Sequence, residues 1–256
     1  MADYDNRVLR GQASAAGAID AGLRSYMLRI YNYMLMGLGI TGVAAYGGYM
    51  AAVTTDPSAA VARLHGGLML TSFGVALFSG PLLWILLFGS LGVVLFLSFR
   101  INKMSVMTAQ ISFLAYAAMV GLTFASLFVV YTQTSIAQVF FITAATFGAM
   151  SLWGYTTKTD LTGFGSFLFM GLIGVVIASV VSIFVQSTML TWIISVAGVL
   201  IFTGLTAYDT QWIKNNYAES DDSTTAGRKA IFGALKLYLD FINLFLMLLR
   251  LMGNRR

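Results

Sequence analysis

The chain has 256 residues, of which 58% are hydrophobic and 10% are charged, and its mean hydropathy is +0.81. Soluble domains carry about 25% charged residues, so this composition excludes an ordinary soluble protein and indicates a membrane protein. The net charge of +5 comes from basic residues scattered at the ends of apolar segments, which favours a lipid bilayer as partner over nucleic acid. The chain has no cysteine, which excludes disulfides and thiolate metal sites.

Seven apolar segments are long enough to be transmembrane helices, since about 20 apolar residues cross the hydrocarbon core. Their predicted ranges are 27–53, 81–99, 104–131, 136–156, 164–185, 190–213 and 230–251. The apolar, glycine-rich stretch 66–80 before the second segment is predicted to be an interfacial piece or an outward extension. The sequence therefore predicts an all-α integral membrane protein. It has a mobile cytosolic tail at residues 1–25 and a seven-helix transmembrane domain at residues 26–256.

Basic residues predict the orientation in the membrane, because cytosolic loops carry an excess of lysine and arginine. With a cytosolic N-terminus, the cytosolic segments hold Arg7, Arg10, Arg24, Arg29, Arg100, Lys103, Lys158, Lys214, Arg228 and Lys229. The loops between helices on the other side hold only Arg63. Seven full crossings would place Arg250, Arg255 and Arg256 outside, whereas a re-entrant last helix would return them to the cytosol. The sequence leaves both arrangements open.

Two aspartates lie inside predicted transmembrane helices, Asp209 in the sixth and Asp240 in the seventh. A carboxylate in hydrocarbon is costly, so an ionisable residue at membrane depth indicates a functional site. Asp209 lies five residues before Lys214 and Asp240 four residues after Lys236, which predicts a similar depth for both in the cytosolic half.

The last helix carries a polar stripe in an otherwise apolar segment. Lys236, Asp240, Asn243, Met247 and Arg250 are spaced by four, three, four and three residues, which places them on one face. In a bilayer such a stripe must face protein or a water-filled cavity. The last helix is therefore predicted to be central, with this stripe turned inward.

Two neighbouring carboxylates resist double ionisation and tend to share one proton. Losing that proton adds repulsion that can spread the helices, and it exposes hard oxygen ligands suited to Ca²⁺. A structural explanation is also open, in which Asp240 pairs with Lys236 one turn earlier and Asp209 reaches water near the interface.

The segments AYDTQWI at 207–213 and LYLDFINLFLMLLRL at 237–251 resemble the signature of the Bax inhibitor family of membrane proteins. The resemblance implies two three-helix layers around a central C-terminal helix. It also implies that Asp209 and Asp240 form a pH-sensing pair that gates a Ca²⁺ leak. Some members carry a basic residue in the second helix that pairs with one aspartate; Arg100, at the end of that helix, is the only candidate here.

Gln211, Lys236 and Asn243 are further candidates for supporting the pair or lining the ion pathway. The resemblance predicts a pH-sensitive, calcium-permeable leak channel that uses calcium ions and protons and no cofactor. The alternative is an interaction protein that modulates a membrane-bound protease or a stress or cell-death response. The C-terminal sequence GNRR lacks the lysine-rich tail of eukaryotic members, so a bacterial plasma (inner) membrane is expected.

An enzymatic function is not expected. An intramembrane aspartyl protease also carries two aspartates on adjacent helices, but its second aspartate lies in a Gly-x-Gly-Asp motif with a Pro-Ala-Leu turn beyond. Here Leu237-Tyr238-Leu239 precedes Asp240, and Pro57 and Pro81 are the only prolines. His65 is the only histidine, which excludes a histidine pair or a His-Glu metal motif.

Overall fold

The computed structural model describes residues 2–63 and 67–256, with side chains from Ala21 onward, so His65 lies outside the described residues. The helices are α1 Ala2–Ala52, α2 Ser72–Phe78, α3 Pro81–Arg100, η1 Ile101–Lys103, α4 Val106–Phe124, α5 Leu127–Val130, α6 Gln133–Thr156, α7 Thr162–Val185, α8 Thr188–Asn215 and α9 Ser223–Met252. Three two-residue strands, β1 Val53–Thr54, β2 Ala62–Arg63 and β3 Met69–Leu70, form an antiparallel sheet in the order β1-β3-β2.

Within the described part of the chain, seven helical segments are long and apolar enough to cross a membrane, which confirms the all-α membrane fold. Most predicted boundaries lie within three residues of the observed ones. The predicted helix 104–131 is instead divided into α4 and α5, because Ser126 donates its hydroxyl to Thr123 O and Thr123 donates to Met119 O. Such side-chain bonds to helix carbonyls compete with the regular backbone pattern.

The first helix is longer than predicted, since α1 is helical from Ala2 rather than from residue 27. Alanine, the strongest helix former, is frequent between residues 13 and 21, and no proline occurs before Pro57. The mobility and the cytosolic location of residues 1–25 stay predictions.

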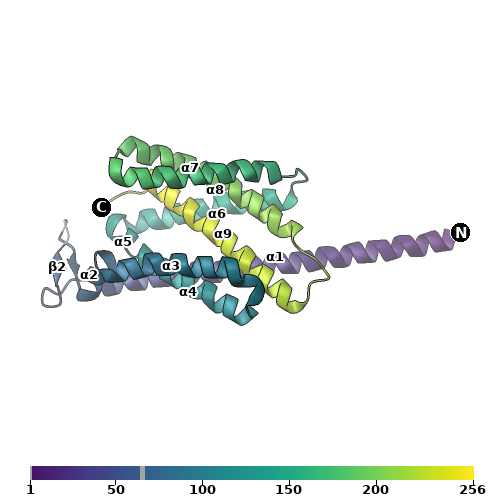
Figure 1. Cartoon of the computed structure of the whole chain (residues 1–256), viewed down its shortest axis with the longest axis horizontal. Helices are drawn as coiled ribbons and strands as arrows, with labels where there is room; N and C mark the ends of the chain where they lie inside the picture. Colours follow the sequence, from purple (N-terminus) through teal and green to yellow (C-terminus); the bar gives the residue numbers. More distant parts are fainter. Residues whose placement is uncertain (1, 64–66) are drawn as a thin grey trace.

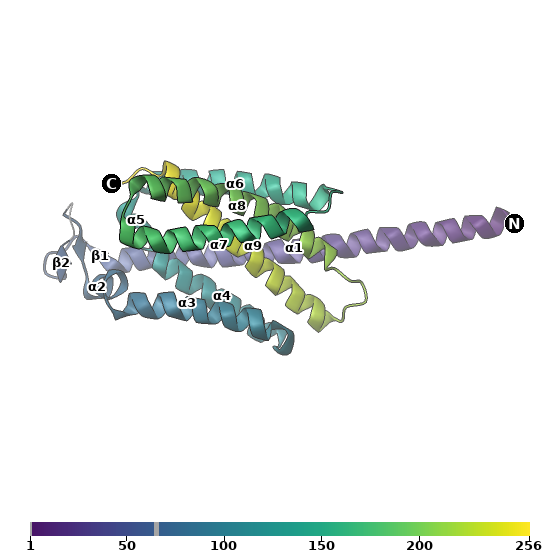
Figure 2. The same ribbon diagram turned by 45° about the horizontal axis from the view of Figure 1, so that its top comes forward.

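The transmembrane helices form two groups of three on either side of α9 (Figures 1 and 2). In one group α4 packs between α1 and α3, and in the other α8 packs between α6 and α7. The last helix contacts α8, α1, α6 and α4. The two layers around a central C-terminal helix are therefore present in the structure.

The central position of α9 is also seen in its buried fraction, which is higher than that of the other six spans. In its most apolar window 72% of residues are buried, against 11–33% in the other six spans. At Gly233 an added Cβ would lie 3.3 Å from the side chains of Ile213 and Ile30, so glycine lets α8 and α1 approach α9 closely. Further along, the buried Tyr238 hydroxyl shares a hydrogen bond of 2.7 Å with Thr41 of α1. Small residues and one buried polar pair thus fix α9 between the layers.

The chain ends at the opposite end of the bundle from its N-terminus (Figures 1 and 2). Arg256 N–H donates to Val130 O at 3.0 Å, and Thr132 N–H donates to Asn254 O at 3.1 Å. The Arg256 guanidinium also contacts the Tyr49 hydroxyl near the end of α1, at 3.4 Å. Because α9 is one uninterrupted helix of 30 residues, the geometry favours a full crossing over a re-entrant last helix.

Single cysteines introduced into this cysteine-free chain test that topology. We expect Arg255→Cys to react in intact cells with a membrane-impermeant maleimide, and Ser220→Cys in the α8–α9 loop to react only after permeabilisation. Ser58→Cys, in the exposed loop after β1, is the control for the outer side. Arg255→Cys and Ser220→Cys reacting alike would contradict the seven crossings.

Candidate functional site

A groove of about 1180 Å³ runs between α7 and α9 and has α8 as its floor. All five residues of the polar stripe on α9 line it, namely Lys236, Asp240, Asn243, Met247 and Arg250. Asp209 and Tyr208 line it from α8, and Ser166 and Ser179 line it from α7. The stripe therefore faces a cavity between helices, as its spacing predicts.

Asp209 forms an ion pair with Lys236 across the α8–α9 interface. The Lys236 Nζ donates to Asp209 Oδ1 at 2.7 Å, and Asp209 is only 7% exposed. The same ammonium lies 4.8 Å from the centre of the Trp212 ring, one turn after Asp209 on α8. The ring face adds a cation–π attraction that keeps the lysine at this depth.

Asp240 lies against this ion pair and is 5% exposed. It lies close enough to Asp209 and Lys236 for its charge to interact with both, although only Asp209 is within ion-pair distance of the lysine. Its Oδ2 has no hydrogen-bond partner among the described residues. One ammonium is thus bound to one of two neighbouring buried carboxyl groups, and the charges of these three groups sum to zero only when one carboxyl group holds a proton.

The observed ion pair differs from the structural alternative raised by the sequence. That alternative pairs Lys236 with Asp240 one turn along the same helix, whereas the lysine binds Asp209 on the neighbouring helix. The spacing of four residues puts both side chains on one face, but it does not say which side chain on α8 lies opposite them. Only the packing of α8 on α9 supplies that information.

Arg100 is not brought to the aspartates. It is exposed at the end of α3, in the other helical layer, and does not line the groove. Among the described residues, the cation that forms an ion pair with an aspartate of this pair is Lys236 of α9, which binds Asp209. The basic partner that the resemblance assigns to the second helix is thus contributed here by the last helix.

The three consecutive residues Asp209, Thr210 and Gln211 point to three different neighbours, because successive side chains on a helix are about 100° apart. Thr210 shares a hydrogen bond of 2.9 Å with Ser151 of α6, which shares one of 2.6 Å with Tyr31 of α1. Gln211 points away from the groove, toward the loop between α6 and α7.

Gln211 holds that loop through both ends of its amide. Its Oε1 accepts from Leu161 N–H and its Nε2 donates to Thr159 O, each at 2.8 Å. Gln211 therefore supports the start of α7, one wall of the groove, and does not line the groove itself. Asn243 does line it, and its Nδ2 donates to Leu239 O at 2.8 Å.

The groove offers too few ligand atoms for a resident metal ion. Among the described residues no three Asp, Glu, His or Cys side chains gather in a cluster. Ca²⁺ takes six to eight oxygen ligands, whereas Asp209 and Asp240 offer four carboxylate oxygens, one of them bound to Lys236. Asn243 can add one more. This arrangement suits a passing cation better than a permanently bound one.

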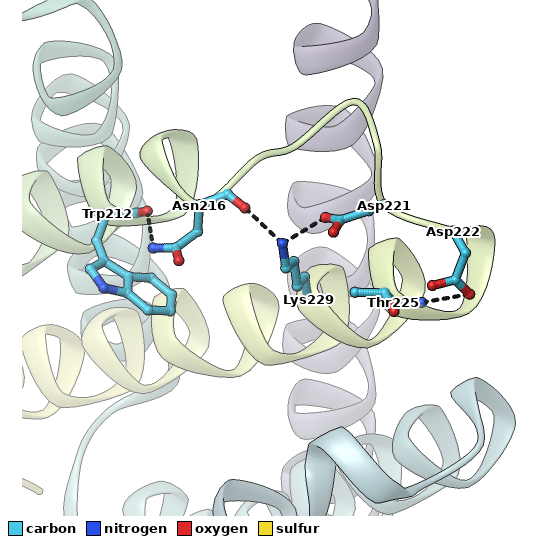
Figure 3. Close-up of polar contacts among 6 residues, drawn as sticks. All are labelled: Trp212, Asn216, Asp221, Asp222, Thr225 and Lys229. Atoms are coloured by element: carbon cyan, nitrogen blue, oxygen red, sulfur yellow. Dashed lines mark hydrogen bonds and ion pairs between the residues drawn. The ribbon is translucent and has the colours of Figure 1, made fainter.

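The connection between α8 and α9 fixes the register of the two helices (Figure 3). Lys229 binds Asp221 Oδ2 at 2.6 Å and Asn216 O at 3.1 Å, and Asn216 Nδ2 donates to Trp212 O at 2.8 Å. These bonds hold the start of α9 against the end of α8.

Asp222 caps the N-terminus of α9, where it accepts from the N–H groups of Thr224 and Thr225. Hydrogen bonds from Thr225, with smaller contributions from Thr224, hold the pKa of the exposed Asp222 below its usual value. The sequence Asp-Ser-Thr-Thr at 222–225 is a helix-start signal. It explains why α9 begins seven residues earlier than predicted.

The model of the family described as "Inhibitor of apoptosis-promoting Bax1" matches residues 23–256. The chain belongs to the Bax inhibitor family. The match begins near the N-terminal end of the first predicted span and includes all seven predicted spans, which confirms the resemblance found in the two aspartate segments.

Two bacterial relatives cover nearly the whole chain. The inner membrane protein YbhL of Escherichia coli K12 is 47% identical over 239 residues, which are 92% of this chain and 94% of YbhL. Protein RP147 of Rickettsia prowazekii is 43% identical over 256 residues, the full length of both chains. The family match, a bacterial inner membrane relative and seven apolar helices agree with the predicted multi-pass protein of a bacterial inner membrane.

A double-mutant cycle tests the cross-helix ion pair. We expect Lys236→Met to lower the free energy of unfolding in detergent by about 3 kcal/mol, because it leaves a buried carboxylate without its partner. Adding Asp209→Asn removes that carboxylate, so the double variant should be less destabilised than the sum of the singles by about 1 kcal/mol or more.

Lys103→Met is the matched control, since Lys103 is exposed and lies outside the groove. Its effect should be small and should add to that of Asp209→Asn. Strict additivity of Lys236→Met and Asp209→Asn would show that the two groups do not interact in solution.

Proposed function

We propose that this protein is a pH-sensitive, calcium-permeable leak channel gated by Asp209 and Asp240. The observation that carries the proposal is a second buried carboxyl group, Asp240, at the wall of the same groove as the Asp209–Lys236 ion pair and without a hydrogen-bond partner for its Oδ2 among the described residues. A structural ion pair with Lys236 requires only one carboxylate, so it explains Asp209 but does not explain the burial of Asp240. An extra ionisable group at membrane depth is typical of ion and proton pathways.

In the closed state Lys236 neutralises Asp209, and Asp240 is protonated. Loss of that proton leaves two carboxylates beside one ammonium, so repulsion between the carboxylates favours their separation. A divalent cation stabilises the same pair of charges and competes with Lys236 for Asp209. The gate is thus a competition between a proton, the lysine and Ca²⁺ for the same two carboxyl groups.

The groove provides the path that an ion follows after it has passed the two aspartates. It continues along α9 past Asn243 to Arg250 at the outer end, with Ser179 and Ser182 on the opposite wall. Most of its remaining lining is apolar, including Val176 and Ile183 of α7. Such a lining repels hydrated ions, so conduction requires α7 and α9 to move apart.

We also propose that the protein has no catalytic activity. Asp209 and Asp240 resemble the pair of an intramembrane aspartyl protease only in lying on adjacent helices. A lysine bound to one carboxylate blocks the arrangement in which both aspartates hold a single water for attack on a peptide. The alternative, modulation of a membrane-bound protease, does not require ion passage and remains compatible with the same fold.

Ca²⁺ flux into liposomes that contain only this protein tests the gating mechanism. In the wild type we expect flux to rise with pH between about pH 6 and 8, as the shared proton is lost. Asp209→Asn and Asp240→Asn keep the size of the side chain but cannot ionise, so each should flatten this dependence. The pH dependence of flux in the double variant should be no flatter than in either single variant, because the two carboxyl groups act as one unit.

Flux is normalised to folded protein, and Asp160→Asn is the control because Asp160 is an exposed carboxylate at the start of α7. The control should keep the wild-type pH dependence. If both single variants at the pair also keep it, the paired-aspartate gate is wrong, and an absence of Ca²⁺ flux at every pH would overturn the channel itself.

A further inference from the structure

A second groove, of about 650 Å³, lies between α1 and α6 and is closed at its base by Phe241 of α9. It is separate from the aspartate groove, which lies between α7 and α9. Its walls are apolar side chains such as Met27, Met34 and Phe147. Leu35 and Leu152 border it and are 61% and 64% exposed, so the groove opens to the surrounding bilayer.

The groove has the dimensions of a lipid chain. It extends along α1 from Arg24 to Leu38, a rise of about 21 Å at 1.5 Å per residue. One leaflet of the hydrocarbon core is about 15 Å thick. An acyl chain whose headgroup stays level with Arg24 therefore occupies about two-thirds of the groove, as far as about Met34.

The mouth of the groove is positively charged. Arg24 lines the groove and is exposed, whereas Arg29, five residues further along the same helix, is exposed but does not line it. Lys214 donates to Tyr155 O at 2.7 Å and lies 5.2 Å from the centre of the Tyr155 ring, which lines the groove from α6. Asp20, four positions before Arg24, has its side chain outside the described part of the chain; including it still leaves this mouth net positive.

The two grooves differ in chemistry. The aspartate groove contains carboxyl groups, whereas no described carboxylate lines the groove between α1 and α6. The polar atoms inside the second groove belong to Tyr31 and Ser151, which are bonded to each other at 2.6 Å. The interior thus suits a hydrocarbon chain and the mouth suits an anionic group.

We propose that the groove between α1 and α6 is a binding site for an anionic phospholipid of the leaflet on the N-terminal side. The phosphate and headgroup lie at Arg24, and one acyl chain extends from there into the groove toward Phe241. Lysine and arginine at a membrane surface attract anionic lipids. The site holds one lipid more firmly than the lipids that surround the remaining helices.

Native mass spectrometry of the purified full-length protein tests the headgroup. The probes are phosphatidylglycerol and phosphatidylcholine with identical acyl chains, added separately in detergent. We expect the wild type to retain phosphatidylglycerol preferentially. Arg24→Gln should reduce that preference about fivefold, the effect of one basic residue near an anionic surface.

Arg100→Gln is the matched control, because Arg100 is an exposed arginine at the same end of the bundle. It lies on α3 and lines neither of the two grooves. It should leave the preference unchanged. Equal retention of the two lipids by the wild type, or an equal loss in Arg24→Gln and Arg100→Gln, would overturn the proposal and leave only nonspecific lipid contact.

Filling the groove tests the acyl chain. No atom lies within 4 Å of a Cβ built on Gly148, which lines the groove, so Gly148→Leu adds a side chain there without a clash at Cβ. This variant should retain less of both lipids. Gly92→Leu on α3, also with open space around its Cβ, should behave as the wild type. Undiminished retention by Gly148→Leu would place the lipid elsewhere.

Discussion

Burial of two carboxyl groups at membrane depth is the constraint on which this architecture depends. An aspartate at the centre of a membrane helix costs about 3 kcal/mol on insertion scales, and more in the absence of water. The ion pair with Lys236 offsets part of that cost for Asp209, and Asp240 lies at the wall of the same groove. The central position of α9 follows, since a helix with this stripe cannot turn it toward lipid.

The rest of the bundle holds α8 and α9 in the one register that brings these groups together. Thr210 and Gln211, next to Asp209, bind α6 and the loop before α7. Lys229 binds the end of α8 to the start of α9. The part of α8 that carries Asp209 is therefore attached on several sides, whereas α7 and α9 meet across an open groove. Movement of α7 relative to α9 is the least restrained way to open the site.

Hydropathy and spacing predicted the seven helices, the central last helix and the inward stripe, because each depends on chain-local patterns. The break between α4 and α5 was missed because it depends on the side-chain bonds of Ser126 and Thr123. Similarly, the sequence did not show that Arg100 lies away from the aspartates or that Lys236 binds Asp209 rather than Asp240. Those assignments depend on which helices pack together, which a single sequence does not specify.

Distance across the groove tests the gate most directly, since it reports opening without requiring ion passage. Spin labels at Val180→Cys and Arg250→Cys, exposed positions on opposite walls, measure the separation of α7 and α9 in this cysteine-free chain. We expect the distance distribution to shift to longer values as pH rises from about 6 to 8, and the shift to vanish in Asp240→Asn. A distribution that is independent of pH in the otherwise wild-type protein would contradict gating by the aspartate pair.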